Sequence, residues 1–173
     1  MSSTEFDVVI IGGGPAGYAS ALYGASAGLN IALVERQKLG GTCLNVGCIP
    51  AKELLETAAV SRTVKHAGTF GILAEEKGLD WSKTLKRKQG IVDQLVGGLT
   101  GLLKGRKVTV FDGTATLGSD NKTVTVTGGS SDGTQITGDA VILAAGSVPR
   151  TMDGFPIDSK HIVTSDELLS IPE

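Results

Sequence analysis

Short apolar runs, an alanine-rich stretch and a glycine-rich turn alternate over the first 35 residues. Residues 6–11 form a continuous run rich in β-branched side chains, which is typical of a strand buried on both faces of a parallel sheet. Residues 16–27 are alanine-rich and predicted to be helical, and residues 31–34 form a second apolar strand. This order of strand, helix and strand predicts an α/β fold with a parallel sheet and helices on both faces.

Two longer helices are predicted downstream, over residues 53–67 and 81–104, with a loop over residues 68–80 between them. The second helix carries an apolar stripe at helical spacing. It also carries a basic cluster, which we expect to form a solvated helix face rather than a nucleic-acid site. The cluster consists of Lys83, Lys86, Arg87 and Lys88.

From residue 108 the apolar pattern changes to a period of two. Short strands are predicted over residues 108–111, 114–117, 122–126 and 134–137, separated by turns rich in Gly, Asp, Asn and Ser. We expect an antiparallel β-meander inserted into the parallel sheet, after which residues 140–144 return as a buried apolar strand. Near the end of the chain, Thr164 and Glu167 predict a capping box for a short helix through Leu169 that stops by Pro172.

Charge and composition exclude several classes of function. The net charge of −2 gives no reason to expect nucleic acid or an anionic membrane as partner. No apolar run approaches the roughly 20 residues of a membrane helix, and the N-terminal segment does not resemble a signal peptide. We therefore expect a cytoplasmic protein, in which two cysteines are more often catalytic or metal-binding than structural. His66 and His161 have no paired spacing with the cysteines, so no metal site is expected.

The turn after the first strand has the pattern Gly-x-Gly-x-x-Gly. Gly12 is predicted to make the tight turn, Gly14 to admit a pyrophosphate and Gly17 to let the helix pack on the strand. Glu35, 18 residues after Gly17, is placed to accept hydrogen bonds from ribose hydroxyls. The alternative is an ordinary sharp turn with Glu35 in solvent. The glycines do not distinguish FAD from NAD.

Both cysteines lie in one stretch, residues 40–52, with Cys43 and Cys48 five positions apart. On a regular helix that offset separates the Cα atoms by roughly 8.6 Å. A disulfide requires about 4.4 to 6.8 Å, so the backbone must leave regular helix between the two cysteines if they bond, and Gly47 allows this. Two unpaired buried thiols or half of a metal site are the alternatives.

The stretch resembles the redox motif of the flavin-dependent disulfide reductases that use a pyridine nucleotide, Gly-Gly-x-Cys-x-x-x-x-Cys-x-Pro-x-Lys. A second segment, residues 139–150, is similar to the strand and turn that close the FAD site in the same family, with Ala145 where the family more often has threonine. The resemblance covers the whole chain. Within the family, the wording of the motif is most similar to the branch that oxidises dihydrolipoamide.

The resemblance implies a disulfide between Cys43 and Cys48 that exchanges electrons with FAD, while FAD exchanges a hydride with NAD. Cys43 would react with lipoamide or a lipoyl domain of 2-oxoacid dehydrogenase complexes, Cys48 would face the flavin ring, and Lys52 would tune the flavin electrostatically. These three are the predicted catalytic residues. The predicted FAD-binding residues are Gly12, Gly14, Pro15, Ala16, Gly17, Glu35, Arg36, Gly41, Thr42, Cys43, Cys48, Lys52, Gly113, Thr114, Ala144, Ala145, Gly146 and Ser147.

Members of this family are more than twice as long as this chain. We expect residues 1–150 to form the FAD-binding domain and residues 151–173 a linker toward an NAD-binding domain, as in an excised or truncated N-terminal part. The family homodimer, the nicotinamide site and the acid–base histidine belong to the other parts, so turnover with NAD is not expected from this chain alone. Other disulfide reductases (glutathione, trypanothione or mercuric type), a non-catalytic FAD-binding module and a plain NAD-binding dehydrogenase domain are the alternatives.

Overall fold

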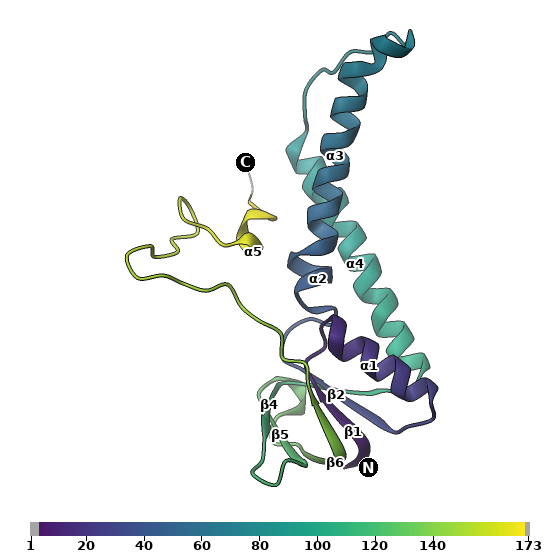
Figure 1. Ribbon diagram of the computed structural model, residues 1–173, viewed down its shortest axis with the longest axis vertical. Helices are drawn as coiled ribbons and strands as arrows, with labels where there is room; N and C mark the ends of the chain where they lie inside the picture. The colour runs from purple at the N-terminus through teal and green to yellow at the C-terminus, as the bar shows by residue number, and fades with distance from the viewer. Residues whose placement is uncertain (1–3, 172–173) are drawn as a thin grey trace. The chain divides into compact units, whose positions relative to one another are not determined.

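The computed structural model describes residues 4–171. Within this range the strands form one sheet (Figure 1). They are β1 (Glu5–Ile11), β2 (Ile31–Glu35), β3 (Thr109–Asp112), β4 (Thr114–Leu117), β5 (Thr123–Thr127) and β6 (Gln135–Leu143). The α-helices are α1 (Pro15–Ser26), α2 (Gly41–Val46), α3 (Cys48–His66), α4 (Trp81–Gly105) and α5 (Ser165–Leu168), with short 3-10 turns η1 (Ala67–Phe70) and η2 (Gly129–Ser131).

The strand order in the sheet is β3-β2-β1-β6-β5-β4. β3, β2, β1 and β6 run parallel to one another, and β5 and β4 are antiparallel additions next to β6. The register places Val9 of β1 between Ala32 of β2 and Val141 of β6. The predicted α/β architecture, with antiparallel strands inserted before the last parallel strand, is confirmed.

Two details of the predicted meander were wrong. Residues 108–111 were expected to begin it, but β3 pairs in parallel with β2, from Ala32 opposite Thr109 to Glu35 opposite Asp112. Residues 134–137 and 140–144 were expected to be separate strands, but one strand, β6, pairs with β5 at its start and with β1 along its length. A period of two marks a strand without giving its direction, so the sequence pattern left both points open.

The second half of β6 is also less buried than predicted. Ile142 is 38% exposed and Leu143 is 67% exposed, although residues 140–144 were expected to be a buried strand. β5 pairs with β6 only over residues 135–137, whereas β1 pairs with β6 as far as Leu143. Among the described residues, the later half of β6 therefore has a neighbouring strand on one side only.

The core lies where the apolar strands meet. Phe6 and Phe111 meet edge to face, with ring centroids 5.9 Å apart and an angle of 88° between the ring planes. They belong to one buried cluster together with Val9, Ala32, Val34, Val124, Val126 and Ile136. The cluster draws on β1, β2, β3, β5 and β6, so the antiparallel strands complete the core of the parallel ones.

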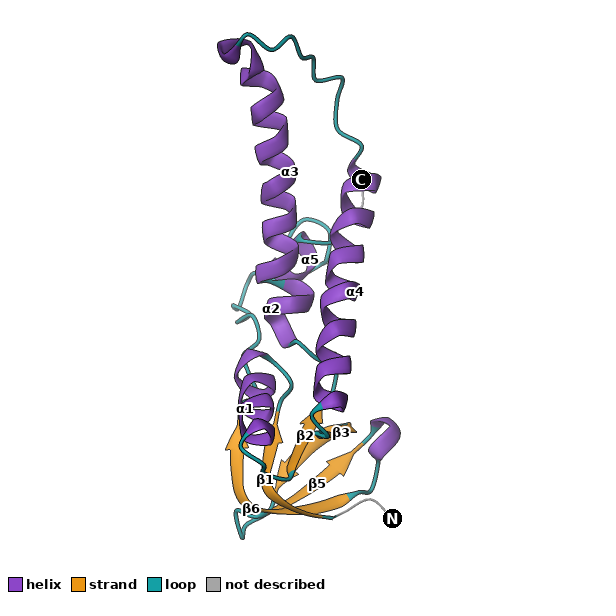
Figure 2. Cartoon of the chain, turned by 90° about the vertical axis from the view of Figure 1, so that its right-hand side faces the viewer, coloured by secondary structure: helices purple, strands orange, loops and turns teal. Residues whose placement is uncertain are grey.

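The chain divides into two compact units. The first comprises residues 4–43 and 95–148 and contains the sheet and α1, and the second comprises residues 44–94 and 149–171. In the second unit α3 and the first part of α4 are joined through η1 and a loop (Figure 2). Pro50 is the buried residue of α3 within the described chain. Two ion pairs tie α3 to later segments of this unit: Lys65 to Glu76 in the loop at 2.9 Å, and Glu53 to Arg87 on α4 at 2.6 Å.

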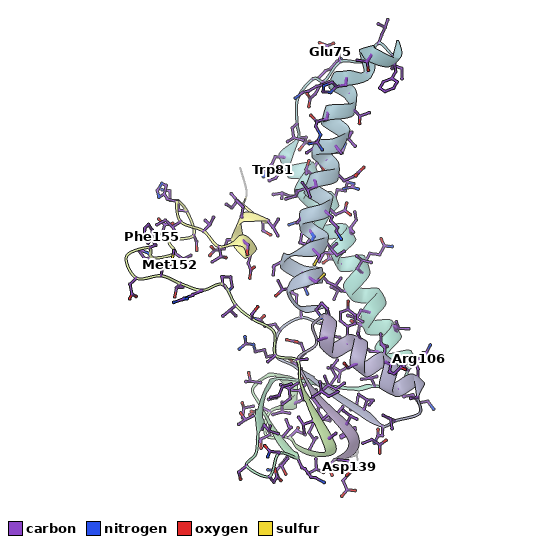
Figure 3. All side chains as sticks on the ribbon, viewed as in Figure 1. Glu75, Trp81, Arg106, Asp139, Met152 and Phe155 are labelled. Atoms are coloured by element: carbon purple, nitrogen blue, oxygen red, sulfur yellow. The ribbon has the colours of Figure 1, made fainter. Side chains whose placement is uncertain are left out.

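One member of the basic cluster is not solvated as predicted. Lys88 is only 4% exposed, and its Nζ donates hydrogen bonds to the Leu169 carbonyl at 2.8 Å and to the Ser170 hydroxyl at 3.2 Å. At the start of the same helix, labelled in Figure 3, the Trp81 Nε1–H donates to the Ile171 carbonyl at 3.0 Å. All three acceptors lie more than 80 residues away in the sequence, so no local pattern could have predicted this burial.

The capping box at Thr164 and Glu167 is present, and it begins α5 as predicted. The predicted stop at Pro172 lies outside the described residues. Across residues 4–171, no helix combines the length and the apolar character that a bilayer crossing requires.

Candidate functional site

The turn between β1 and α1 is built by close backbone contacts. Gly12 has a φ of +107°, and a Cβ added there would lie 2.2 Å from the Ala144 carbonyl oxygen. A Cβ on Gly17 would lie 1.7 Å from the Gly12 carbonyl oxygen. Both positions therefore require glycine, for the tight turn and for helix packing as predicted.

Gly14 is the N-cap of α1, and Pro15 is its first residue. The Tyr18 N–H donates to the Gly14 carbonyl at 2.9 Å, which leaves the N–H groups of Ala16 and Gly17 ahead of the helical ladder. A Cβ on Gly14 would meet only the Gly41 Cα, at 3.8 Å. Free N–H groups, the positive end of the helix dipole and a facing glycine make this a place that suits a phosphate.

Glu35, at the end of β2, is held by backbone N–H groups. Its Oε2 accepts from the N–H of Gly13 at 2.6 Å, and its Oε1 accepts from the N–H of Gln37 at 2.8 Å. The Glu35 carbonyl accepts from the N–H of Gly113 at 3.0 Å, which brings the start of β4 beside it. Because a carboxylate offers about four acceptor positions, Glu35 retains capacity for hydroxyl donors.

The turn after β6 comes to the same edge of the sheet. The Ala144 N–H donates to the Ile11 carbonyl at 2.8 Å, and the Ala144 carbonyl lies against Gly12. Gly146 has a φ of +73°, and residues 145–147 are exposed. The first unit thus brings together the predicted positions of four segments: the β1–α1 turn, the end of β2, Gly113 and the turn after β6.

Two glycines outside the predicted set also shape this edge. The Gly40 N–H donates to the Gly13 carbonyl at 2.8 Å, and Gly40 is buried with a φ of +95°. A Cβ on Gly13 would lie 2.9 Å from Cδ2 of Leu39. Gly40 directly precedes Gly41 in the cysteine motif, so this pair of consecutive glycines is the sequence feature that could have pointed to Gly40. Gly13 fills the free position between Gly12 and Gly14.

Cys43 and Cys48 form a disulfide. α2 ends at Val46, Gly47 has a φ of −143° and a ψ of −109°, and α3 begins at Cys48. The helix is thus interrupted between the two cysteines, as a bond between them requires. Cys43 is half-buried, whereas Cys48 is exposed.

Cys48 is the first residue of α3, and Lys52 lies one turn further along the same helix and is exposed. Both belong to the second unit, whereas Cys43, Thr42 and Gly41 belong to the first. Residues 4–171 contain no cluster of three or more His, Cys, Asp or Glu side chains suited to a metal ion.

A family model described as pyridine nucleotide-disulphide oxidoreductase matches residues 6–171. The chain belongs to this family. Two proteins of Bacillus subtilis (strain 168), both called dihydrolipoyl dehydrogenase, are 40% and 45% identical to it over 99% and 96% of the chain. A third, from Acholeplasma laidlawii and of the same name, is 39% identical over 98% of the chain.

The chain spans 38% and 36% of the length of the two Bacillus relatives and 50% of the Acholeplasma relative. The family description refers both to a pyridine nucleotide and to disulphide chemistry. Family membership therefore accounts for the glycine turn and the disulfide together. It makes two incidental buried thiols or half of a metal site poor explanations of Cys43 and Cys48, which are bonded to each other.

Proposed function

We propose that this chain is the FAD-binding, disulfide-bearing part of a dihydrolipoyl dehydrogenase. One observation carries the proposal: a disulfide closed across an interrupted helix, at Gly47, in a chain whose first unit is built around a dinucleotide turn. A stapling disulfide has no need of a helix N-terminus and a nearby lysine, whereas a disulfide that is repeatedly reduced benefits from both.

The first unit supplies groups that fit FAD. The N–H groups of Ala16 and Gly17 would receive the pyrophosphate, and the bare Cα atoms of Gly14 and Gly41 would leave room for it. Glu35 would accept ribose hydroxyls while the N–H groups of Gly13 and Gln37 hold its carboxylate in place. The remainder of the FAD site would be lined by Arg36, Gly113, Thr114 and the turn formed by residues 144–147. The residues nearest the flavin would be Thr42, Cys48 and Lys52.

The disulfide would be the acceptor of electrons from the dithiol substrate. A thiolate of dihydrolipoamide attacks Sγ of Cys43, the Cys43–Cys48 bond breaks, and Cys48 leaves as a thiolate. The second substrate thiol loses its proton to solvent, and its sulfur attacks the mixed disulfide, so the substrate leaves as a cyclic disulfide and Cys43 leaves as a thiolate. Two electrons have then passed to the protein. Lys52 and the α3 dipole stabilise the Cys48 thiolate.

FAD, when bound, supplies the means of passing this electron pair on as a hydride. We propose NAD as the final acceptor, lipoyl groups of 2-oxoacid dehydrogenase complexes as substrate, and a cytoplasmic homodimer as the form of the longer protein. The name of the relatives, dihydrolipoyl dehydrogenase, supports a dihydrolipoyl substrate, and the 38% and 36% of their length that the chain spans support a longer protein. The family description supports a pyridine nucleotide.

A half-reaction without NAD tests the proposal on the chain itself. Purified protein is titrated with FAD, and binding is followed through flavin fluorescence. Dihydrolipoamide is then added anaerobically, and we expect loss of flavin absorbance in the wild type but not in Cys43→Ser or Cys48→Ser. Failure to bind FAD, or an unchanged rate in either cysteine variant, contradicts the proposal.

Glu35→Gln tests the ribose contact separately. A hydrogen bond to a charged acceptor contributes about 1.5–3 kcal/mol, so we expect FAD to bind roughly ten- to a hundredfold more weakly. Glu56→Gln, an exposed carboxylate on α3, is the matched control and should bind FAD as the wild type does.

A further inference from the structure

The ion pair between Glu53 and Arg87 links α3 to α4 within the second unit. Nη1 of Arg87 lies 2.6 Å from Oε2 of Glu53, and the Glu53 side chain is 20% exposed. This oxygen is shielded from solvent, and the contact with Arg87 is close without the alignment of a hydrogen bond. A shielded carboxylate that loses its charged partner is costly, so the two side chains are coupled more strongly than a pair on an open surface.

The place of this pair along α3 connects it to the disulfide. Glu53 comes five residues after Cys48 on an uninterrupted helix, so their Cα atoms are roughly 8.6 Å apart. Glu53 is also the immediate neighbour of Lys52, the cation expected to favour a Cys48 thiolate. A Glu53 carboxylate without a cationic partner would disfavour a Cys48 thiolate and so counteract the effect of Lys52. A carboxylate neutralised by Arg87 would not.

At the disulfide end of α3, within the described chain, Pro50 is the buried residue. The ties of α3 to the loop after η1 come from Ser61 and Lys65, which both contact Glu76. Those contacts lie near the end of the helix that is remote from Cys48. At the disulfide end, the Glu53–Arg87 ion pair ties α3 to α4.

We propose that Glu53 and Arg87 are positioning residues for the redox disulfide. Their ion pair holds the N-terminal turns of α3 against α4 and cancels the charge of Glu53, so that Lys52 and the helix dipole determine the charge around Cys48. The redox role of the disulfide in this inference rests on the proposed function. Its two physical consequences, for helix order and for thiolate reactivity, can be measured without FAD.

The experiment uses the full chain with Cys43→Ser, which leaves Cys48 as the one thiol, and measures its alkylation by iodoacetamide at pH 7. Arg87→Gln leaves Glu53 charged, and we expect alkylation to slow about two- to fivefold, as a charge at this distance in a partly solvated setting implies. Glu53→Gln frees Arg87, and alkylation should accelerate by a similar factor. The double variant should return to within about twofold of the starting protein.

In this role, the two single variants change the alkylation rate in opposite directions. A merely structural role would shift both rates in the same direction. Hydrogen exchange over residues 48–54 should also be faster in Arg87→Gln and unchanged in β1 and β2. Lys86→Gln and Glu56→Gln, exposed neighbours of the pair, are the charge-matched controls. Equal alkylation rates in all variants, or shifts of one sign, overturn the proposal. Flavin binding and reduction test the function independently.

Discussion

Gly17→Ala is the sharpest test of how the dinucleotide turn is built. The added Cβ would lie 1.7 Å from the Gly12 carbonyl oxygen and 2.8 Å from its carbon. Ordinary contact begins near 3.4 Å, so α1 would have to move by about 1.7 Å from the turn. Both clashing atoms are backbone, and the Ile10 side chain lies directly behind, 3.5 Å from the same Cβ. No rotamer change can relieve such a clash.

Overpacking a well-filled site costs typically about 1–3 kcal/mol, and Gly17→Ala should reach or exceed the upper end because backbone must shift. Replacing glycine by alanine within a helix otherwise stabilises by roughly 0.5–1 kcal/mol. Gly90→Ala on α4, where nothing lies within 4 Å of the added Cβ, should show that gain. Gly24→Ala on α1 meets the end of the Ile31 side chain at 3.0 Å and should fall between the two.

Urea unfolding monitored by circular dichroism gives the free energy of unfolding for the three variants, and FAD titration gives the consequence for the site. We expect the order Gly90→Ala, Gly24→Ala, Gly17→Ala from most to least stable, with FAD binding lost only in the last. If Gly17→Ala were as stable as the wild type and bound FAD equally well, the close contact between α1 and the turn would not exist in solution.

Two further predictions concern Lys88 and Asp120. Burial lowers the pKa of Lys88, and its ammonium donates a hydrogen bond to the Leu169 carbonyl. Lys88→Met should therefore speed amide exchange over residues 165–171 and shift the fluorescence emission of Trp81, the one tryptophan. Lys86→Met, the control, should change neither. Hydrogen bonds from the Thr123 hydroxyl and from the N–H groups of Thr123 and Lys122 lower the pKa of Asp120 from 3.8 to about 2. A carboxyl whose pKa is lower in the folded state stabilises above its unfolded pKa, and that stability is lost as the pH falls from about 4 to about 2. Asp120→Asn should therefore lose less stability than the wild type over that interval in urea unfolding, and equal slopes would contradict the assignment.

The sequence predicted the dinucleotide turn well because backbone sterics alone determine it. A side chain on Gly12 or Gly17 would clash with backbone atoms, so glycine at these two positions directly indicates the geometry of the turn. The interruption of the helix at Gly47 could be predicted once the family resemblance implied a disulfide, since two cysteines five positions apart cannot bond on a regular helix. Strand direction could not be predicted, because a period of two is common to β3, which is parallel, and β5, which is antiparallel.

Long-range polar contacts were beyond prediction for a different reason. Arg87 and Lys88 are adjacent in the sequence and belong to one basic cluster, yet Arg87 pairs with Glu53 and Lys88 is buried against the Leu169 carbonyl. Nothing local distinguishes them from Lys83 or Lys86, which remain exposed. The glycine turn of the first unit is therefore specified by close backbone contacts that tolerate no side chain. In the second unit, Arg87 and Lys88 contact partners far away in the sequence. Substitutions that alter redox reactivity but preserve the fold should accordingly concentrate in α3 and α4, whereas substitutions in the glycine turn should remove cofactor binding and stability together.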